Sequence, residues 1–316
     1  MNEIRLSIVV SVYNIENYIA ECLSSLNITN DVELILINDG SIDDSLAEIH
    51  NKIDMSDLNV RVITQANSGI SNVRNLGIEL SQGKYIMFID GDDYVNYKNL
   101  MEVLEISEKN NSDVVIGNFV SFRGEDKLEK NNSEIQEYIN CNGVDILYNN
   151  FLKDITPSVW KGIYNKKFLV TNELFFLKKV AIAEDFDWLF RVLFHANKVS
   201  AVNLYFYYYR LRDGSAIRSQ FSEEKYKGVL CVVKNLIEFL EENKINELYH
   251  YRFNEMIYAI LVRGVAMYKG AKNKEEIKMI IRKLPVKNVK IKIIGFILYF
   301  SPNLVTKLLN SKYQVG

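Results

Sequence analysis

Three carboxylates stand within four residues at Asp90, Asp92 and Asp93, directly after the apolar segment Tyr85–Ile89. Carboxylates this close repel one another, so a fold keeps them together where a cation or hydrogen-bond donors neutralise them. All-oxygen ligation suits Mg²⁺ or Mn²⁺, with a substrate diphosphate completing the shell. The alternative is a polar turn in which one aspartate caps the next helix. We favour metal binding, because the run follows a predicted strand.

Two further polar clusters also follow apolar segments. Tyr13 and Asn14 come after the first segment, and Asp39-Gly40-Ser41 comes after the second. Gly40 permits a tight turn at which Asp39 can point into a crevice. A carboxylate there can accept a hydrogen bond from a base or a ribose. The simpler interpretation of the same residues is an Asx-turn in which Ser41 caps the following helix.

Short apolar segments alternate with amphipathic ones through the first 120 residues. Strands are expected over Leu6–Val12, Val32–Ile37, Val60–Thr64, Tyr85–Ile89 and Val114–Ile116, and helices over Glu16–Leu26, Asp43–Ile53, Ile70–Leu80 and around Leu100–Ser107. This alternation predicts an α/β fold with a doubly wound, mostly parallel, Rossmann-like sheet. Ligands of such sheets bind beyond the carboxyl ends of the strands, where the three polar clusters are expected to meet.

The second half of the chain becomes helical. Arg123 to Cys141 is charged and Asn-rich, which indicates a mobile surface excursion. Helices are expected over Val144–Leu152, Glu184–Phe194, Tyr226–Glu242, Leu248–Tyr268 and Lys274–Arg282, with an aromatic strand over Val199–Tyr209. We therefore predict a catalytic α/β domain over 1–220, made of halves 1–120 and 121–220, and a helical C-terminal region over 221–316.

Composition excludes several classes of protein. The 316 residues carry a net charge of −2, which argues against nucleic-acid binding. Three scattered cysteines without a CxxC pair indicate neither a disulfide framework nor a zinc site. No GxGxxG or Walker A sequence supports a dehydrogenase or a P-loop enzyme. No segment reaches the roughly eighteen apolar residues of a membrane span, and no signal peptide is evident, so we expect a cytoplasmic protein.

The last forty residues differ in charge from the rest. From Ile277 to Gly316 there are eight Lys or Arg residues and no Asp or Glu. Two short basic, apolar helices, the second starting at Ser301-Pro302, suit the surface of an anionic membrane rather than a span. The alternative is a helical subdomain packed on the catalytic domain or on a second copy in a homo-oligomer. We expect peripheral contact with the inner face of the cell membrane.

Three segments in order resemble glycosyltransferase family 2: SIVVSVYNIENYIAECLSSL, ELILINDGSIDDS and NSGISNVRNLGIELSQGKYIMFIDGDD. The resemblance covers about the first 110 residues. It implies a GT-A fold and inverting transfer from a nucleotide-diphosphate sugar, most often UDP-linked. It also implies a DxD site for Mn²⁺ or Mg²⁺ and a saccharide acceptor, which is lipid-linked in relatives that build bacterial capsule and wall polymers.

The resemblance also implies roles for individual residues. The donor-nucleotide site would comprise Tyr13, Asn14, Asp39, Arg74 and Asp90. Asp39 would contact the uracil ring, and Arg74 would be a basic residue of the donor site. Asp92 would ligate the metal, with Asp90 next to the ribose or sugar.

An acidic pair, Glu184-Asp185, opens a predicted amphipathic helix. Helix-dipole pairing explains the pair from the residues alone. By resemblance Asp185 would be the general base for the acceptor hydroxyl, and Glu184 would help to hold the acceptor. Trp160 could stack on a sugar or be a buried indole. The family's Y-x-R…GS segment offers Arg210, Ser215 and Arg218 as candidate acceptor or diphosphate contacts.

Two other functions remain open from the sequence. A catalytically degenerate transferase could act as a scaffold in a polysaccharide-assembly complex. A DxD phosphatase is less favoured, because that chemistry places the motif on the first strand and leaves Asp39 unexplained. The motifs do not identify the sugar, the linkage or the acceptor.

Overall fold

The computed structural model of the chain describes residues 3–53, 59–123, 127–130, 135–151, 157–180, 182–212, 221–268 and 274–300. The chain divides into two compact units. The sheet unit comprises Met1–Lys179 and Trp188–Ser215, and the helical unit comprises Val180–Asp187 and Ala216–Gly316. Ser215, Arg218 and the helix predicted to start at Ser301-Pro302 lie outside the described residues.

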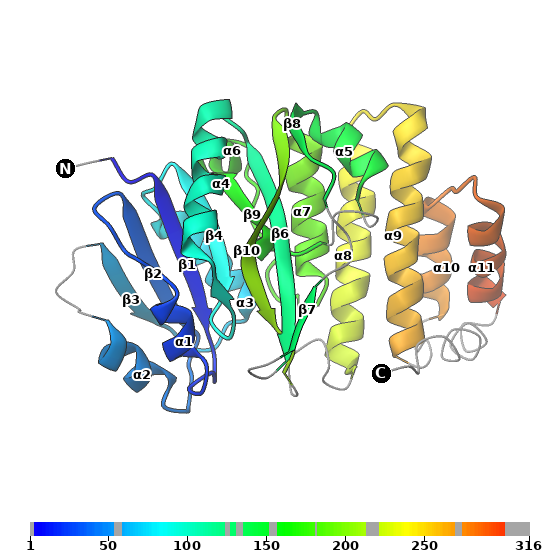
Figure 1. Ribbon diagram of the computed structural model, residues 1–316. Helices are drawn as coiled ribbons and strands as arrows, with labels where there is room; N and C mark the ends of the chain where they lie inside the picture. Colours follow the sequence, from blue (N-terminus) through cyan, green and yellow to red (C-terminus); the bar gives the residue numbers. More distant parts are fainter. Residues whose placement is uncertain are drawn as a thin grey trace. The chain divides into compact units, whose positions relative to one another are not determined.

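The sheet unit is built on one mixed sheet, whose strands are labelled in Figure 1. Its strand order is β3-β2-β1-β4-β9-β6-β10-β5, with β7 beside β6 and β8 beside β10. The strands are β1 (Leu6–Val12), β2 (Val32–Asn38), β3 (Val60–Thr64), β4 (Tyr85–Asp90), β5 (Tyr94–Val95), β6 (Val114–Arg123), β7 (Lys127–Lys130), β8 (Tyr138–Cys141), β9 (Gly162–Asn165) and β10 (Val199–Arg210). The helices of this unit are α1 (Ile19–Ser24), α2 (Ser45–Lys52), α3 (Ile70–Leu80), α4 (Tyr97–Asn110), α5 (Gly143–Asn149), the 3₁₀ turn η1 (Val159–Lys161), α6 (Lys166–Thr171) and most of α7 (Glu184–His195).

The first four strands are parallel neighbours, as the alternating pattern predicts. Nearly every residue of β1 and β2 is buried, since helices cover both faces of the sheet. This explains why these segments read as continuous apolar runs. Gly77 lets α3 lie close to the sheet, because a Cβ there would fall 2.4 Å from a methyl carbon of Val9. The predicted α/β, GT-A type fold is confirmed in this half of the sheet.

The other half of the sheet mixes strand directions. β9 lies between β4 and β6 and runs antiparallel to both, and β5 is antiparallel to β10. The excursion predicted from Arg123 to Cys141 also contains sheet, because β7 pairs with β6 and β8 pairs with β10. The prediction of an excursion was therefore wrong for these strands. Each of these strands is only four residues long, which is too short to give a clear periodic signal in the sequence.

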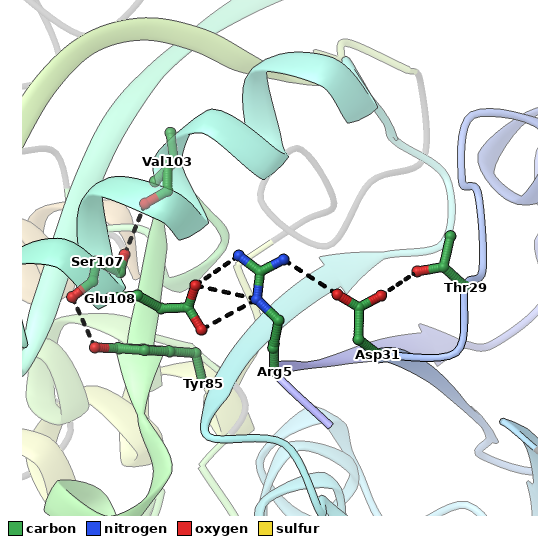
Figure 2. Close-up of polar contacts among 7 residues, drawn as sticks. All are labelled: Arg5, Thr29, Asp31, Tyr85, Val103, Ser107 and Glu108. Atoms are coloured by element: carbon green, nitrogen blue, oxygen red, sulfur yellow. Dashed lines mark hydrogen bonds and ion pairs between the residues drawn. The ribbon is translucent and has the colours of Figure 1, made fainter. Parts of the chain in front are cut away.

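A charged network joins elements at the amino ends of the parallel strands. Arg5, just before β1, donates from Nε to Glu108 on α4 at 3.0 Å and from Nη1 to Asp31 at 3.1 Å. Tyr85 donates its hydroxyl proton to the Ser107 carbonyl at 2.8 Å. Figure 2 shows the whole network, made by Arg5, Thr29, Asp31, Tyr85, Val103, Ser107 and Glu108. These contacts fasten β1 and β4 to α4.

The helical unit contains α8 (Glu223–Glu242), α9 (Glu247–Met267), α10 (Lys274–Lys283) and α11 (Val289–Phe300), which confirms the predicted helical pattern after Ser222. Ser222 caps α8, where its hydroxyl accepts a hydrogen bond from the Lys225 amide. Helices α8 and α9 pack closely, because Gly264 has no side chain to separate its backbone from Val229. Over the described ranges, no helix combines the length and apolar content needed to cross a membrane.

Candidate active site

Asp39 follows β2 and fastens the loop that leads into α3. Its Oδ1 accepts hydrogen bonds from the Ser68 amide at 2.9 Å and from Gln65 Nε2 at 2.7 Å, and its Oδ2 accepts one from the Gly69 amide at 2.8 Å. Gly40 adopts a φ of +73°, and a Cβ there would lie 2.9 Å from the Asn67 amide nitrogen. The turn therefore requires glycine, and it directs the Asp39 carboxylate across the end of the sheet.

The loops after β1 and β2 are tied together through Asn14. This residue has a φ of +50°, its Oδ1 accepts a hydrogen bond from the Ile42 amide, and its own amide donates to Ser41 Oγ. The prediction that Ser41 caps the next helix was wrong, because α2 starts after Asp44 without a side-chain cap. Tyr13 is 49% exposed beside this junction. Asn14 thus shapes the loop, and Tyr13 offers an open aromatic ring.

Asp90 ends β4 directly beside β1. Ser11 donates to Asp90 Oδ1 at 3.1 Å, and Arg74 donates to the same oxygen from Nη2 at 3.2 Å. Arg74 is buried on α3, with its guanidinium 5.5 Å from the ring centre of Phe176. The structure therefore brings two predicted donor-site residues, Asp90 and Arg74, into direct contact.

Two arginines, one at the end of β10 and one just after it, donate hydrogen bonds to Asp92. The Arg212 side chain donates from Nε to Asp92 Oδ2, and Arg210 donates from Nε to the Asp92 carbonyl at 2.8 Å. Burial and the neighbouring Asp90 charge raise the pKa of Asp92, while Arg212 acts in the opposite direction. Asp92 is thus a carboxylate whose ionised form benefits from a cation.

Asp93 lies in the same turn and serves the fold, because β10 binds its carboxylate. Its carboxylate is 1% exposed and accepts hydrogen bonds of 2.7 Å from the Tyr207 hydroxyl and from the Arg210 amide. Burial, followed by repulsion from Asp92 and Asp90, raises its pKa well above the ordinary value. Asp93 therefore anchors β10 to the turn Asp90–Asp93, called the acidic turn below.

Trp160 is a buried indole in this structure, with 6% of its surface exposed. Its ring stacks on Tyr207 with centroids 4.4 Å apart and on Tyr209 at 5.3 Å, and it meets Phe119 edge-on at 4.9 Å. Arg210, by contrast, lies over the rings of Tyr18 and Phe122, where it also pairs with Glu21. The aromatic residues of β10 thus form the wall that supports the acidic turn.

Glu184 and Asp185 open α7 and are partly exposed. The preceding residue, Ala183, has a φ of +67°, which is strained for a side chain with a Cβ. Ala183, Glu184 and Asp185 belong to the helical unit, whereas the carboxylates of Asp90, Asp92 and Asp93 belong to the sheet unit. The role of Asp185 as general base therefore stays a prediction.

The carboxylates fit a cation bound jointly with substrate. Among the residues that the structure describes, no group of three or more His, Cys, Asp or Glu side chains is arranged to hold a metal ion. Asp93 is already bound to Tyr207 and Arg210, which leaves Asp92 as the first candidate ligand and Asp90 beside it. A divalent ion can complete such a sparse set with water and diphosphate oxygens.

Sequence reasoning missed three residues that contact the acidic turn: Ser11, Tyr207 and Arg212. Ser11 lies inside a strand that reads as pure core. Tyr207 belongs to an aromatic run that predicts packing, and its contact with Asp93 depends on how β10 crosses the sheet. Arg212 lies within the Y-x-R…GS segment, so its positive charge next to the candidate residues Arg210 and Ser215 could have identified it.

Comparison with known proteins identifies relatives of the chain. Residues 7–175 match the sequence model of "Glycosyl transferase family 2". "Putative glycosyltransferase EpsH" of Bacillus subtilis (strain 168) is 32% identical over 268 residues, covering 83% of this chain and 76% of EpsH. The poly(ribitol-phosphate) beta-N-acetylglucosaminyltransferase TarS of Staphylococcus aureus (strain Mu50 / ATCC 700699) is 25% identical over 72% of this chain and 40% of its own length.

A solved structure of S. aureus TarS 1-349 in complex with UDP-GlcNAc has the same fold. It superposes with a TM-score of 0.76 at 20% identity, covering 98% of this chain and 92% of that one. The matched residues include the loops that carry Asn14, Asp39 and Asp90. The polar loops at the carboxyl ends of β1, β2 and β4 are therefore those of a known transferase family, and the chain belongs to glycosyltransferase family 2.

Proposed function

We propose that the chain is an inverting, metal-dependent glycosyltransferase that moves a sugar from a UDP-sugar to a hydroxyl of a lipid-linked saccharide acceptor in bacterial surface polysaccharide synthesis. The observation that carries the proposal is the pair Asp90 and Asp92, each held by an arginine at one end of the sheet. Arg74 and Arg212 supply the positive charge that a donor diphosphate requires, and the two aspartates suit its metal ion. The S. aureus TarS structure with UDP-GlcNAc supports this type of donor.

The nucleoside would lie over the loops after β1 and β2. Asp39 Oδ1 already accepts three hydrogen bonds, whereas Oδ2 accepts one, from the Gly69 amide. A carboxylate has about four acceptor positions, so Oδ2 retains capacity for the N–H of a uracil ring. The exposed ring of Tyr13 could pack against the base. These contacts would orient the donor without taking part in bond cleavage.

Bound Mn²⁺ or Mg²⁺ would supply Lewis-acid stabilisation for the charge that develops as the nucleoside diphosphate leaves. Asp92 would hold the ion, and Asp90 would stand next to the ribose or sugar. Arg210 would hold the turn in place through its hydrogen bond to the Asp92 carbonyl. Arg212 forms an ion pair with Asp92 in this structure, and once the metal ion binds Asp92 it could contact the phosphates instead.

Asp185 would act as the general base that takes the proton from the acceptor hydroxyl. Its support comes from its position at the start of α7, directly after a short strained segment at Ala183. Strain of this kind is concentrated at functional sites, because the surrounding fold must hold it. Glu184, next to it and partly exposed, would contact the acceptor.

Contact with an anionic membrane is supported by one face of α11. Val289, Ile293, Phe296 and Phe300 recur every three or four residues and are each between 56% and 69% exposed. The chain from Ile277 onward carries eight basic residues and no acidic ones. An apolar stripe flanked by lysines suits the surface of a bilayer, where a lipid-linked acceptor would be found.

Flotation with anionic liposomes tests the membrane contact. The double variant Ile293→Asp and Phe296→Asp should abolish binding. Met279→Asp is a matched control, because Met279 is a 59% exposed apolar residue of α10 outside the stripe. Failure of the wild type to float would refute membrane contact, and unchanged flotation of the double variant would show that the α11 stripe does not make it. Loss of self-association by the same variant would identify a second copy as the occupant.

Calorimetric titration of UDP, with and without Mn²⁺, tests the donor site. Binding should need Mn²⁺ and should weaken in Asp92→Ala, while Asp31→Ala at the opposite end of the sheet should bind as the wild type does. Binding of another nucleotide in place of UDP would be compatible with the proposed transferase function but would overturn the uridine assignment. Failure of every nucleotide would favour the scaffold interpretation over the enzyme.

A further inference from the structure

Lys161 reaches the same end of the sheet from a different element. It ends η1, directly before β9, and β9 runs antiparallel to β4 with Ile163 opposite Met87. This direction places η1 at the end of β4 that carries Asp90, and η1 contacts both β4 and β6. The backbone of Lys161 therefore lies beside the end of β4, on the side of β9 and β6, and its side chain extends to the Phe119 ring.

The Lys161 side chain is 3% exposed, and its Nζ lies 5.0 Å from the ring centre of Phe119. Across the described parts of the chain, no hydrogen bond or ion pair is formed by its ammonium group. The other buried cations differ, since Arg74 pairs with Asp90 and Arg191 donates to the Phe175 carbonyl. A buried charge without an anionic partner is unfavourable. Burial lowers the pKa of Lys161 to about 8, so the amine is still mostly protonated at neutral pH.

Aromatic rings link Lys161 to the acidic turn. Phe119 meets Trp160 edge-on, and Trp160 stacks on Tyr207. The Tyr207 hydroxyl in turn donates to Asp93 and accepts from the Asp90 amide at 3.2 Å. An ion pair formed beside these apolar rings would be stronger than one in open solvent. The surroundings of Lys161 are therefore suited to an anion that arrives with a ligand.

We propose that Lys161 is a specificity-determining residue that receives an anionic group of the acceptor, either a phosphate or a carboxylate. The proposal rests on the glycosyltransferase function given above. The acceptor is favoured over the donor, because the donor's diphosphate has its own cations in Arg74 and Arg212. A lysine ammonium is a point charge with three donors, so it suits either anion.

Binding of small sugars to the protein saturated with UDP and Mn²⁺ tests the proposal. The probes are glucose 6-phosphate and glucuronate, which carry the two anions, and neutral glucose. Both anionic probes should bind more tightly than glucose, and Lys161→Met should weaken them roughly 10- to 100-fold while glucose binding stays unchanged. Lys161→Arg, which keeps the charge, should restore part of the affinity.

The same variants separate the possible failures. Lys161→Met should fold, and its melting temperature should rise, because it removes an uncompensated buried charge. Equal binding of the anionic probes by Lys161→Met and the wild type would reduce the lysine to a packing role. Binding of the anionic probes to the UDP-free protein but not to the UDP-saturated protein would assign the anion to the donor and overturn the acceptor assignment. Failure of the wild type to bind UDP would instead refute the proposed function, whatever the Lys161 variants show.

Discussion

The two ends of the parallel strands use charge in opposite ways. At the amino end, Arg5 lies between Glu108 and Asp31, so each charge has a partner of opposite sign (Figure 2). A hydrogen bond from Thr29 and the ion pair with Arg5 lower the pKa of Asp31. At the carboxyl end three aspartates stand within four residues, and although Arg74 and Arg212 pair with Asp90 and Asp92, the pKa values of Asp92 and Asp93 are raised.

The difference shows what each end contributes. The amino end fastens β1 to α4 and gains stability from pairs that are complete within the chain. The carboxyl end holds groups whose charges are incompletely compensated, which is costly in the free protein and favourable once a cation or an anion binds. Interactions left incomplete in this way are typical of binding and catalytic sites. Variants of the two ends should therefore separate activity from stability.

Asp185→Asn should have the largest effect on activity. Without a base for the acceptor hydroxyl, transfer should fall by about 10²- to 10⁴-fold. UDP binding should stay, because the base contacts the acceptor and not the nucleotide. Transfer rates and UDP calorimetry measure the two parts, and a variant with near-normal transfer would refute the base assignment.

Asp92→Asn should reduce activity at the carboxyl end without loss of stability. Transfer should fall by roughly 100-fold or more, because a neutral amide stabilises a metal ion poorly. The melting temperature of the free protein should stay the same or rise, since repulsion from Asp90 is removed. A lower melting temperature together with normal transfer would show that Asp92 serves the fold instead.

Lys161→Met should raise stability by about 3 kcal/mol at neutral pH, from the shift of the lysine pKa from 10.5 to about 8. The sign follows from the direction of the shift. Between these pH values the unfolded chain binds the proton and the folded chain does not, so wild-type stability rises with pH in this window. The advantage of the variant should thus shrink above pH 8 and vanish near 10.5. Denaturant unfolding of both proteins across this range measures it, and a constant difference would contradict the cause.

Asp31→Asn changes the amino end of the strands, and it should have the smallest effect on stability and none on activity. A partly exposed ion pair is worth roughly 0.5–1 kcal/mol, and transfer should be unaffected. Because the Asp31 pKa is lowered in the folded state, its contribution is present above the ordinary aspartate pKa and is lost as pH falls further. The wild type and the variant should converge in unfolding experiments at acid pH. A loss of transfer by Asp31→Asn would remove the distinction between the two ends.

The sequence predicted most of the sheet unit's first half, because local signals agree there. Buried parallel strands read as apolar runs, and α3 matches its predicted bounds, Ile70–Leu80. The second half gave weaker signals. The β9 segment is four residues long and lies between two antiparallel neighbours, so it has neither the length nor the periodicity of a recognisable strand.

The sequence by itself determined the α/β class, the family and the acidic turn with Asp90 and Asp92, because these depend on residues close together in the chain. Only the tertiary structure decided which groups complete the turn. Tyr207 and Arg212 stand more than a hundred residues from the aspartates they contact, and the path of β10 across the sheet brings them there. Tertiary structure likewise decided that Lys161 is buried without an anionic partner, since burial and distance to opposite charges depend on every element packed around a side chain.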